Sequence, residues 1–320
     1  MSRFDLPLHE LEGFRPDVRE PADFDEFWAR TLAESRACTT PSSVGAADPL
    51  LPGVVARDVR FSGFGGERIA GWLITPADGD PLRGAVVQYV GYGGGRGLAH
   101  EHLAWATAGY AHLVMDTRGQ GSGWSVGATP DPWGAGPAVP GMMTRGIEDP
   151  HTYYYRRLIT DAALAVDAMR ALDLVAPDRV AVAGGSQGGG LALAVAGLVS
   201  DIRALIADVP FLCHFERAVG YTDAAPYREI RDLLRIQREA ATTVFETLSY
   251  IDGVNFARRA TAPALFSVGL EDVVCPPSTV YAARNHYAGP SEVDVFPFNG
   301  HEGGGAERWP RLARWLDSQA

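Results

Sequence analysis

The sequence has 320 residues, of which 46% are hydrophobic and 21% are charged, and this balance excludes a mainly disordered chain. The net charge of -11 argues against a nucleic-acid-binding or membrane-binding face, because both need clustered basic residues. All 28 basic residues are arginine, so a catalytic lysine is excluded.

No linker rich in Gly, Ser or Pro divides the chain, so we expect residues 1–320 to form one domain. Cys38, Cys213 and Cys275 are too few and too scattered for a disulfide framework or a zinc site. The first residues show no basic segment followed by an apolar one, and no apolar run approaches about 18 residues. We therefore expect a cytoplasmic protein without a metal site.

The first predicted element is an amphipathic helix over residues 22–36, where Phe24, Phe27, Trp28 and Leu32 recur at helical spacing. Strands and helices then alternate, which predicts an α/β fold with a mostly parallel sheet covered on both faces. The predicted strands are 55–62, 67–75, 84–90, 111–115, 178–183, 204–209, 263–268 and 292–297. The predicted helices are 100–108, 152–173, the stretch after 186, 224–248, 277–288 and 303–318.

Two segments interrupt the alternation. Residues 119–146 are rich in Gly and Pro and longer than a usual connection, which is typical of a functional loop or a subunit contact. Residues 211–258 lie between two predicted strands and contain recurring aromatic side chains among charged ones. We interpret this second segment as a mostly helical, cap-like insertion over the site.

The predicted strand 178–183 leads into Gly184-Gly-Ser-Gln-Gly188, and a helix-forming stretch follows. Gly-x-Ser-x-Gly between a strand and a helix is the pattern of a nucleophile elbow, which presents the Ser186 hydroxyl at a sharp turn. In a chain with 37 glycines the motif also occurs by chance, so its catalytic role depends on finding its partners.

A serine nucleophile needs a histidine base and a carboxylate that orients the histidine. In the fold class with this elbow, the acid and then the base follow the nucleophile, on loops after later strands. Asp272 and its neighbour Glu271 follow one predicted strand and both stay candidate acids, while His301 follows the next predicted strand and is the preferred base. Glu271 is the alternative acid, and His286 is an alternative base that belongs to a helical pattern instead.

The oxyanion of ester hydrolysis needs two backbone N–H donors. Gln187, which follows the nucleophile, is the first candidate, and Tyr92, in the glycine-rich loop after the strand 84–90, is the second. A phosphate-binding role of that loop is weak, because no Gly-Lys-Ser/Thr follows. Phe211 is a candidate wall of the acyl pocket, with a core aromatic as the alternative.

Eight motifs in order resemble the acetyl xylan esterase and cephalosporin-C deacetylase family, the seventh carbohydrate esterase family, with an α/β-hydrolase fold. They are PADFDEFW (21–28), RGQG (118–121), GMMTRGI (141–147), TYYYR (152–156), GGSQG (184–188), FETLSY (245–250), GLEDVVCPPS (269–278) and GHE (300–302). The resemblance covers almost the whole chain. One departure is the stretch Gly93-Gly-Gly-Arg96, where relatives have polar residues, and it is expected to alter the entrance to the site.

The resemblance implies specific roles for the site residues and an assembly. Ser186, Asp272 and His301 would form the catalytic triad, and the Tyr92 and Gln187 N–H groups would bind the oxyanion. Family members form hexamers whose active sites open to an inner chamber that admits short acetylated sugars. The loop 119–146 is then a candidate interface of a homo-oligomer.

We therefore expect a serine esterase that removes acetyl groups from small acetylated carbohydrates such as xylo-oligosaccharides, and from cephalosporin C. The reaction would pass through an acetyl-enzyme intermediate and need no metal or organic cofactor. The alternatives are a general short-chain carboxylesterase and another α/β-hydrolase, such as a dienelactone hydrolase or a peptidase. A catalytically silent binding protein is the alternative outside the enzymes.

Overall fold

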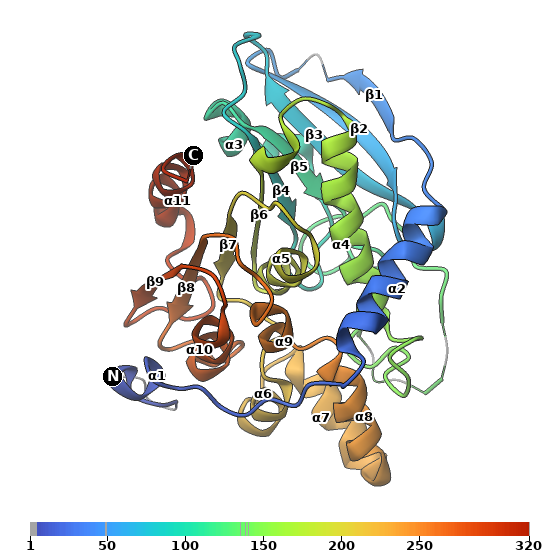
Figure 1. Cartoon of the computed structure of the whole chain (residues 1–320), viewed down its shortest axis with the longest axis vertical. Coiled ribbons are helices and arrows are strands. Elements are labelled where there is room, and N and C mark those ends of the chain that lie inside the picture. The colour runs from blue at the N-terminus through green and yellow to red at the C-terminus, as the bar shows by residue number, and fades with distance from the viewer. Residues whose placement is uncertain (1–4, 49, 135, 138, 140, 320) are drawn as a thin grey trace.

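The computed structural model describes residues 5–48, 50–134, 136–137, 139 and 141–319. Their strands form one sheet in the order β1-β2-β3-β5-β4-β6-β7-β8-β9 (Figure 1). The six strands β4 to β9 run parallel to their neighbours among these six, whereas the β1–β2, β2–β3 and β3–β5 pairs are antiparallel. The strands are β1 (Ser43–Ala47), β2 (Val54–Ser62), β3 (Arg68–Pro76), β4 (Ala85–Tyr89), β5 (Ala111–Met115), β6 (Val180–Gly185), β7 (Leu205–Asp208), β8 (Ala264–Gly269) and β9 (Ser291–Phe296). The mostly parallel sheet predicted from the sequence is confirmed.

Alternate residues of the central strands point to opposite faces of the sheet. Val87 and Val182 belong to the larger core, whereas Val86 and Ala181 belong to a smaller core on the other face. The helices α2 (Phe24–Ala37), α4 (Tyr154–Ala171), α5 (Gln187–Leu198) and α10 (Pro277–His286) contribute to the larger core, and α3 (Ala104–Thr107) and α11 (Trp309–Asp317) to the smaller one. Helices therefore cover both faces, as the near-continuous apolar strands require.

The predicted aromatic stripe of the first long helix is confirmed. In α2, the four side chains Phe24, Phe27, Trp28 and Leu32 are at most 4% exposed. Trp28 also donates its indole N–H to the Tyr250 carbonyl at 2.9 Å. The stripe fastens the N-terminal part of the chain to α4 and to the segment before β8 (Figure 1).

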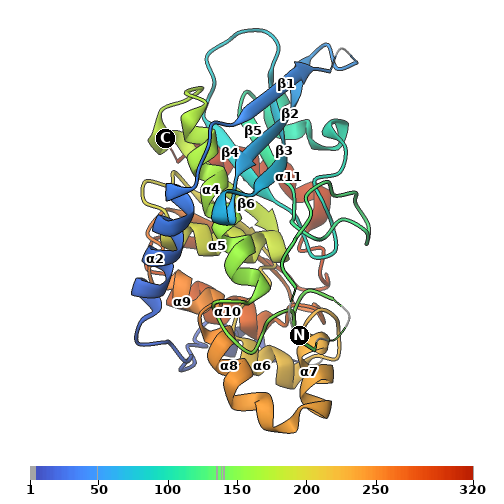
Figure 2. The same cartoon turned by 90° about the vertical axis from the view of Figure 1, so that its right-hand side faces the viewer.

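Four short helices fill the segment between β7 and β8, where the sequence predicts a mostly helical insertion. They are α6 (Phe215–Tyr221), α7 (Tyr227–Ile236), α8 (Ala241–Ser249) and α9 (Gly253–Ala257). In Figure 2, α6, α7 and α8 form the lower end of the molecule. The described part of the loop 119–146 contains no helix or strand, and residues 135, 138 and 140 of this loop lie outside the described residues.

One predicted boundary is wrong and one strand is missing from the prediction, both for local reasons. The closing helix begins at Trp309 instead of residue 303, because Gly303, Gly304 and Gly305 have positive φ angles of 51°, 92° and 56°. β1 was not predicted, since its five residues are all exposed and show no alternation. The remaining short elements are α1 (Leu8–Leu11) and the 3₁₀ turns η1 (Phe64–Gly66), η2 (Ala99–His102), η3 (Pro177–Arg179), η4 (Arg238–Ala240) and η5 (Gly305–Arg308).

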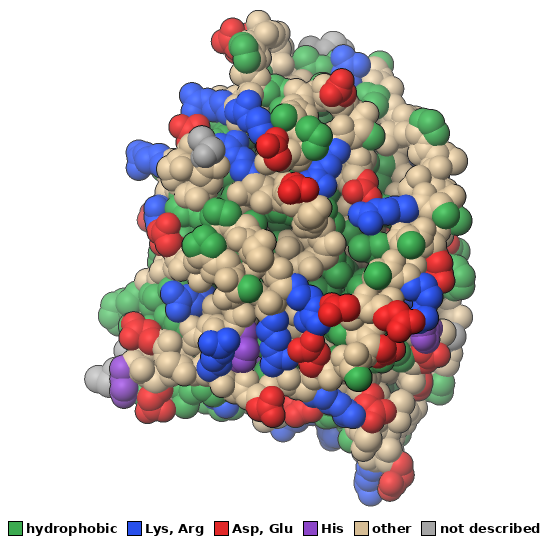
Figure 3. Space-filling view, viewed as in Figure 1, with side chains coloured by type: hydrophobic (Ala, Val, Ile, Leu, Met, Phe, Trp, Pro, Cys, Tyr) green, Lys and Arg blue, Asp and Glu red, His purple; other side chains and the backbone are tan. Residues whose placement is uncertain are grey.

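The charged side chains are mixed on the surface. On the face seen in Figure 3, arginines lie beside acidic residues and do not gather in a basic stripe. Within the described residues, no helix combines the length and the apolar character that crossing a bilayer requires.

Candidate functional site

Ser186 lies in the turn between β6 and α5, with a φ of 56° and a ψ of −120°. A positive φ is uncommon for a non-glycine residue, so the surrounding structure must hold this strained turn. Two glycines permit it: a Cβ on Gly184 would lie 2.3 Å from the carbonyl carbon of Gly188, and a Cβ on Gly188 would lie 2.2 Å from the Tyr89 carbonyl oxygen. The structure therefore contains the sharp strand-to-helix turn that the sequence predicts.

His301 connects Ser186 to Asp272. Its Nε2 lies 2.8 Å from Ser186 Oγ, and its Nδ1 lies 2.8 Å from Asp272 Oδ2. Asp272 is fully buried, and its Oδ1 accepts the backbone N–H groups of Val274 and Cys275 at 2.8 and 2.9 Å. Because an ionised carboxylate only accepts hydrogen bonds, Nδ1 donates to Asp272 and Nε2 accepts from the Ser186 hydroxyl.

The structure thus brings together three residues that the sequence places on three separate segments. The alternative residues make other contacts. The His301 ring bonds to Asp272 and not to Glu271, whose backbone N–H donates to the Asn299 carbonyl. His286 lies in α10, where its Nδ1 is 2.8 Å from the Ala282 carbonyl oxygen.

Two backbone donors lie beside Ser186. Within the described part of the chain, the N–H groups of Tyr92 and Gln187 have no acceptor. Gln187 is the first residue of α5, so its N–H is one of the unpaired donors at a helix N-terminus. The Tyr92 loop passes close to Ser186, since a Cβ on Gly91 would lie 4.0 Å from Ser186 Cβ. Both N–H groups are therefore available near Ser186, and their role toward an oxyanion stays a prediction.

Two side chains of the loop 119–146 hold the peptide that joins Tyr92 to Gly93. Gln120 Oε1 accepts the Gly93 N–H at 2.6 Å, and Trp124 donates its indole N–H to the Tyr92 carbonyl at 2.8 Å. Both polar groups of one peptide are thus fixed, which restrains the neighbouring Tyr92 N–H. Sequence reasoning missed both contacts: Gln120 stood in the RGQG motif without an assigned role, and Trp124 carried no signal.

Gln120 also contacts Gln187, the residue after Ser186. Its Nε2 donates to the Gln187 side-chain oxygen at 2.9 Å and to the Tyr154 hydroxyl at 3.0 Å. Tyr155 donates to the same Gln187 oxygen at 3.0 Å, and burial raises the pKa of the Tyr155 phenol well above its usual value, so it remains a donor. One hydrogen-bonded network therefore holds both segments that supply the candidate N–H donors.

Arg118 anchors the start of the loop 119–146. It is fully buried and forms a two-pronged ion pair with Asp161 of α4, at 2.5 and 2.7 Å, and a further bond to Glu67 at 2.5 Å. Its carbonyl accepts the Tyr154 hydroxyl at 2.6 Å. Breaking the ion pairs of a buried guanidinium costs much free energy. Arg118 therefore fixes the position at which the loop 119–146 leaves the sheet.

The Tyr92 side chain connects three segments. Its hydroxyl donates to Glu229 Oε1 at 2.7 Å and accepts the Met142 N–H at 2.6 Å. Glu229 Oε2 accepts the Met143 N–H at 3.1 Å. Burial raises the pKa of the Glu229 carboxyl, and the bonds from Tyr92 and Met143 oppose that rise. Through Glu229 of α7, the segment 211–258 contacts the candidate site, and its function as a cap stays a prediction.

Phe211 is 0% exposed and lies behind Tyr92, with ring centroids 6.4 Å apart. Its ring also packs on Tyr227 at 4.4 Å, and its backbone N–H donates to the Ser186 carbonyl at 2.9 Å. The residue therefore belongs to the core and touches the elbow through its backbone. Its predicted contact with an acyl group stays a prediction.

The stretch 93–96 has a packing reason for its glycines. A Cβ on Gly94 would lie only 2.5 Å from Trp124 Cζ2, so a larger residue would displace that indole. The Arg96 side chain is buried against β2 and β3, where it bonds to Asp58 at 2.5 Å and to the Gly71 carbonyl at 2.7 Å. Gly94 thus leaves room for the Trp124 indole on the Tyr92 loop, and Arg96 ties the end of this stretch to β2 and β3.

A possible metal ligand set exists among the described residues. Asp272, Cys275 and His301 place a carboxylate, a thiol and an imidazole within 4.8 Å of one another. Asp272 and His301 already bond to each other, however, and burial raises the pKa of the Cys275 thiol well above its usual value. A neutral thiol is a poor metal ligand, so this cluster suits the hydrogen-bonded chain better than a cation.

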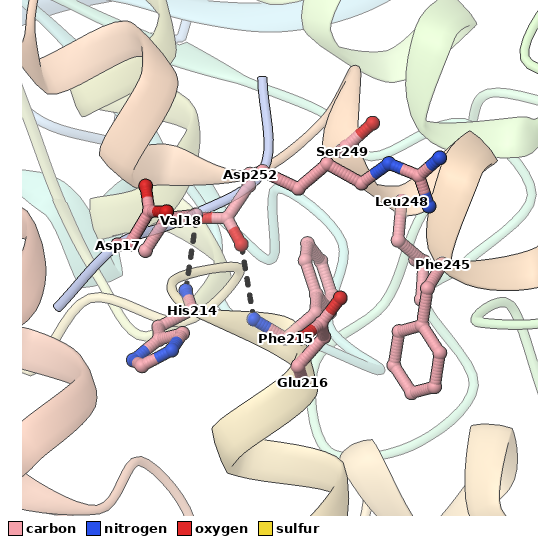
Figure 4. Close-up of a pocket in the computed structure, with 10 residues that line it drawn as sticks. Asp17, Val18, His214, Phe215, Glu216, Phe245, Leu248, Ser249 and Asp252 are labelled. Carbon is pink, nitrogen blue, oxygen red and sulfur yellow. Dashed lines mark hydrogen bonds between the residues drawn. The ribbon is translucent and has the colours of Figure 1, made fainter. Parts of the chain in front are cut away.

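A small hollow between α6, α8 and α9 holds the Asp252 carboxylate that caps α9 (Figure 4). Its volume is about 20 Å³, which is room for one water molecule. Asp252 lies in it and accepts the backbone N–H groups of His214, Phe215 and Val254 at 2.9 to 3.0 Å. Burial raises the pKa of Asp252 to about 6 and lowers that of His214 to about 4, so at neutral pH an ionised carboxylate caps α9 beside an uncharged imidazole.

Comparisons with known proteins cover almost the whole chain. The model of the family described as acetyl xylan esterase (AXE1) matches residues 1–319. The solved acetyl xylan esterase from Paenibacillus sp. R4 is 39% identical, with a TM-score of 0.91 over 98% of this chain and 99% of that one. Acetyl xylan esterase 1 from Thermoanaerobacterium sp. JW/SL YS485 is 32% identical, with a TM-score of 0.91 over 99% of both chains. The acetyl esterase Axe7A of Xylanibacter ruminicola is 29% identical over 92% of this chain and 67% of that protein.

Proposed function

The chain belongs to the acetyl xylan esterase family and is a carboxylic ester hydrolase, and we propose that it removes acetyl groups from small acetylated carbohydrates such as xylo-oligosaccharides. The observation that carries the mechanism is the position of His301, 2.8 Å from both Ser186 Oγ and Asp272 Oδ2. Cephalosporin C is a further acetyl ester within the proposed substrate range.

In the proposed acylation, Ser186 Oγ attacks the acetyl carbonyl carbon while His301 Nε2 takes the hydroxyl proton. Asp272 keeps the Nδ1 proton in place and stabilises the imidazolium that forms. The Tyr92 and Gln187 N–H groups bind the oxyanion, and because neither donor has a protein acceptor among the described residues, no bond must break first. His301 then gives the proton to the departing sugar oxygen, and the acetyl group stays on Ser186.

Deacylation repeats these steps with water. His301 takes a proton from the attacking water, the oxyanion forms again at the same two N–H groups, and the Ser186 oxygen leaves with the proton that His301 returns. Acetate is released and the enzyme is restored. The nucleophile, the base and the oxyanion donors all come from the chain, so the proposed cycle uses no metal or organic cofactor.

Acyl-chain length tests this proposal. We expect kcat/KM for 4-nitrophenyl acetate to exceed that for the butyrate ester by about tenfold or more, because an acyl site fitted to a two-carbon acetyl group must be enlarged to admit two further methylenes. Acetate release from acetylated xylo-oligosaccharides and from cephalosporin C, followed by pH-stat titration, tests the alcohol side. Faster turnover of butyrate or octanoate esters would replace the proposal with a general carboxylesterase.

We also propose that the chain assembles as a hexamer, as its resemblance implies, and that it acts in the cytoplasm. Val126 and Trp133 support a contact through the loop 119–146, since these apolar side chains are 59% and 51% exposed. Light scattering on the purified protein is expected to give six times the mass of one chain. A mass of one chain at micromolar concentration would contradict the assembly without touching the proposed chemistry.

A further inference from the structure

Trp124 is an exposed aromatic residue that is nevertheless held in place. Trp124 is 68% exposed to solvent, while its indole N–H donates to the Tyr92 carbonyl at 2.8 Å. The six-membered ring of the indole rests on the glycine loop, because a Cβ on Gly94 would lie 2.5 Å from its Cζ2. A large apolar ring that is both fixed and open to solvent is preorganised for a ligand.

The indole lies beside the nucleophile. A Cβ on Gly91 would be 3.5 Å from Trp124 Cζ2 and 4.0 Å from Ser186 Cβ, so Trp124 and Ser186 both lie next to Gly91. Phe211 is fully buried and Tyr92 is half-buried, so the side of Ser186 that these two residues form is closed to solvent. The departing alcohol needs a path to solvent, and Trp124 is the exposed side chain that borders Ser186 on the loop side.

We propose that the exposed face of Trp124 is the platform on which the sugar ring of the acetylated substrate stacks during attack by Ser186. This inference rests on the proposed function, which supplies the sugar alcohol. A pyranose presents axial C–H groups that are apolar and slightly positive, and an indole face is apolar and carries negative quadrupole charge. The platform would thus bind the alcohol part of the ester and leave the acetyl group to the oxyanion site.

Trp124 also has a second, separable effect. Its indole N–H and Gln120 Oε1 together hold the Tyr92–Gly93 peptide. Loss of the N–H alone therefore loosens the oxyanion loop and slows every ester, whatever its alcohol. Loss of the ring face weakens only those esters whose alcohol carries a ring.

Two variants separate the effects. Trp124→Phe keeps an aromatic face without the N–H, and Trp124→Ala removes both. Kinetics are measured on monoacetylated xylotriose, on cyclohexyl acetate and on ethyl acetate, which share one acyl group. We expect Trp124→Phe to lower kcat on all three by a similar factor. Relative to Trp124→Phe, Trp124→Ala is expected to raise KM about tenfold for the two ring esters and less than twofold for ethyl acetate.

Trp133→Ala is the matched control, because Trp133 lies on the same loop, is 51% exposed and donates its N–H to Glu67. It should leave all three KM values within twofold of wild type, with the folded state of each variant checked by circular dichroism and its assembly by light scattering, because Trp133 also belongs to the proposed subunit contact. Equal changes for ring and ethyl esters between the Phe and Ala variants would overturn the platform. Failure of the wild type to deacetylate xylotriose, with cyclohexyl acetate still hydrolysed, would contradict the proposed function and the sugar assignment instead.

Discussion

Replacing Ser186 with alanine is expected to lower kcat for 4-nitrophenyl acetate by about 10⁶-fold, since the reaction then loses its nucleophile and retains only binding and the oxyanion donors. The fold should survive. Ser186 already has a φ of 56°, a strain that alanine shares, and the substitution removes a single side-chain hydrogen bond, the one to His301. Stopped assays with enzyme at micromolar concentration give the residual rate, and thermal unfolding gives the stability.

Labelling provides an independent check on the same residue. A fluorophosphonate probe should modify wild-type Ser186, which peptide mass spectrometry identifies, and it should not modify Ser186→Ala. A variant with a rate near that of the wild type, or a wild type that resists the probe, would rule out Ser186 as the nucleophile. The second result would favour a catalytically silent binding protein.

Replacing Asp272 with asparagine is expected to lower kcat by about 10⁴-fold. The Val274 and Cys275 N–H groups donate to Asp272 Oδ1, so the amide oxygen of asparagine will occupy that position. Its NH₂ group then points at His301 Nδ1, which must become an acceptor, and the proton moves to Nε2. A histidine protonated at Nε2 cannot take the Ser186 proton, although the geometry of the site is unchanged.

Glu271→Gln is the matched control, because it makes the same chemical change one residue earlier. Glu271 has no side-chain bond to His301, so kcat should stay within about twofold of wild type. Both variants are measured with 4-nitrophenyl acetate across pH 6 to 9. A large loss in Glu271→Gln together with a small loss in Asp272→Asn would exchange the roles of the two carboxyls.

Predictions that depend on local pattern agreed with the structure. Strand-like apolar runs located eight strands, because strands that helices cover on both faces of a parallel sheet are apolar along most of their length. The elbow at Ser186 was visible because strand, glycine, serine and helix are adjacent in sequence. The two predictions that failed also have local causes. β1 has no buried face, so its residues show no apolar pattern, and Gly303, Gly304 and Gly305 keep the closing helix from starting before Trp309.

The sequence by itself determined the fold class and the order of Ser186, Asp272 and His301, because each follows a recognisable strand whose C-terminus lies at one edge of a parallel sheet. Only the tertiary structure decided how the Tyr92 loop is held. Gln120, Trp124 and Glu229 contact this loop from 27 to 137 residues away in sequence, through side-chain contacts that no local period encodes. Such contacts depend on how the loop 119–146 and α7 pack in three dimensions, which is why the turn at Ser186 could be predicted and the contacts around it could not.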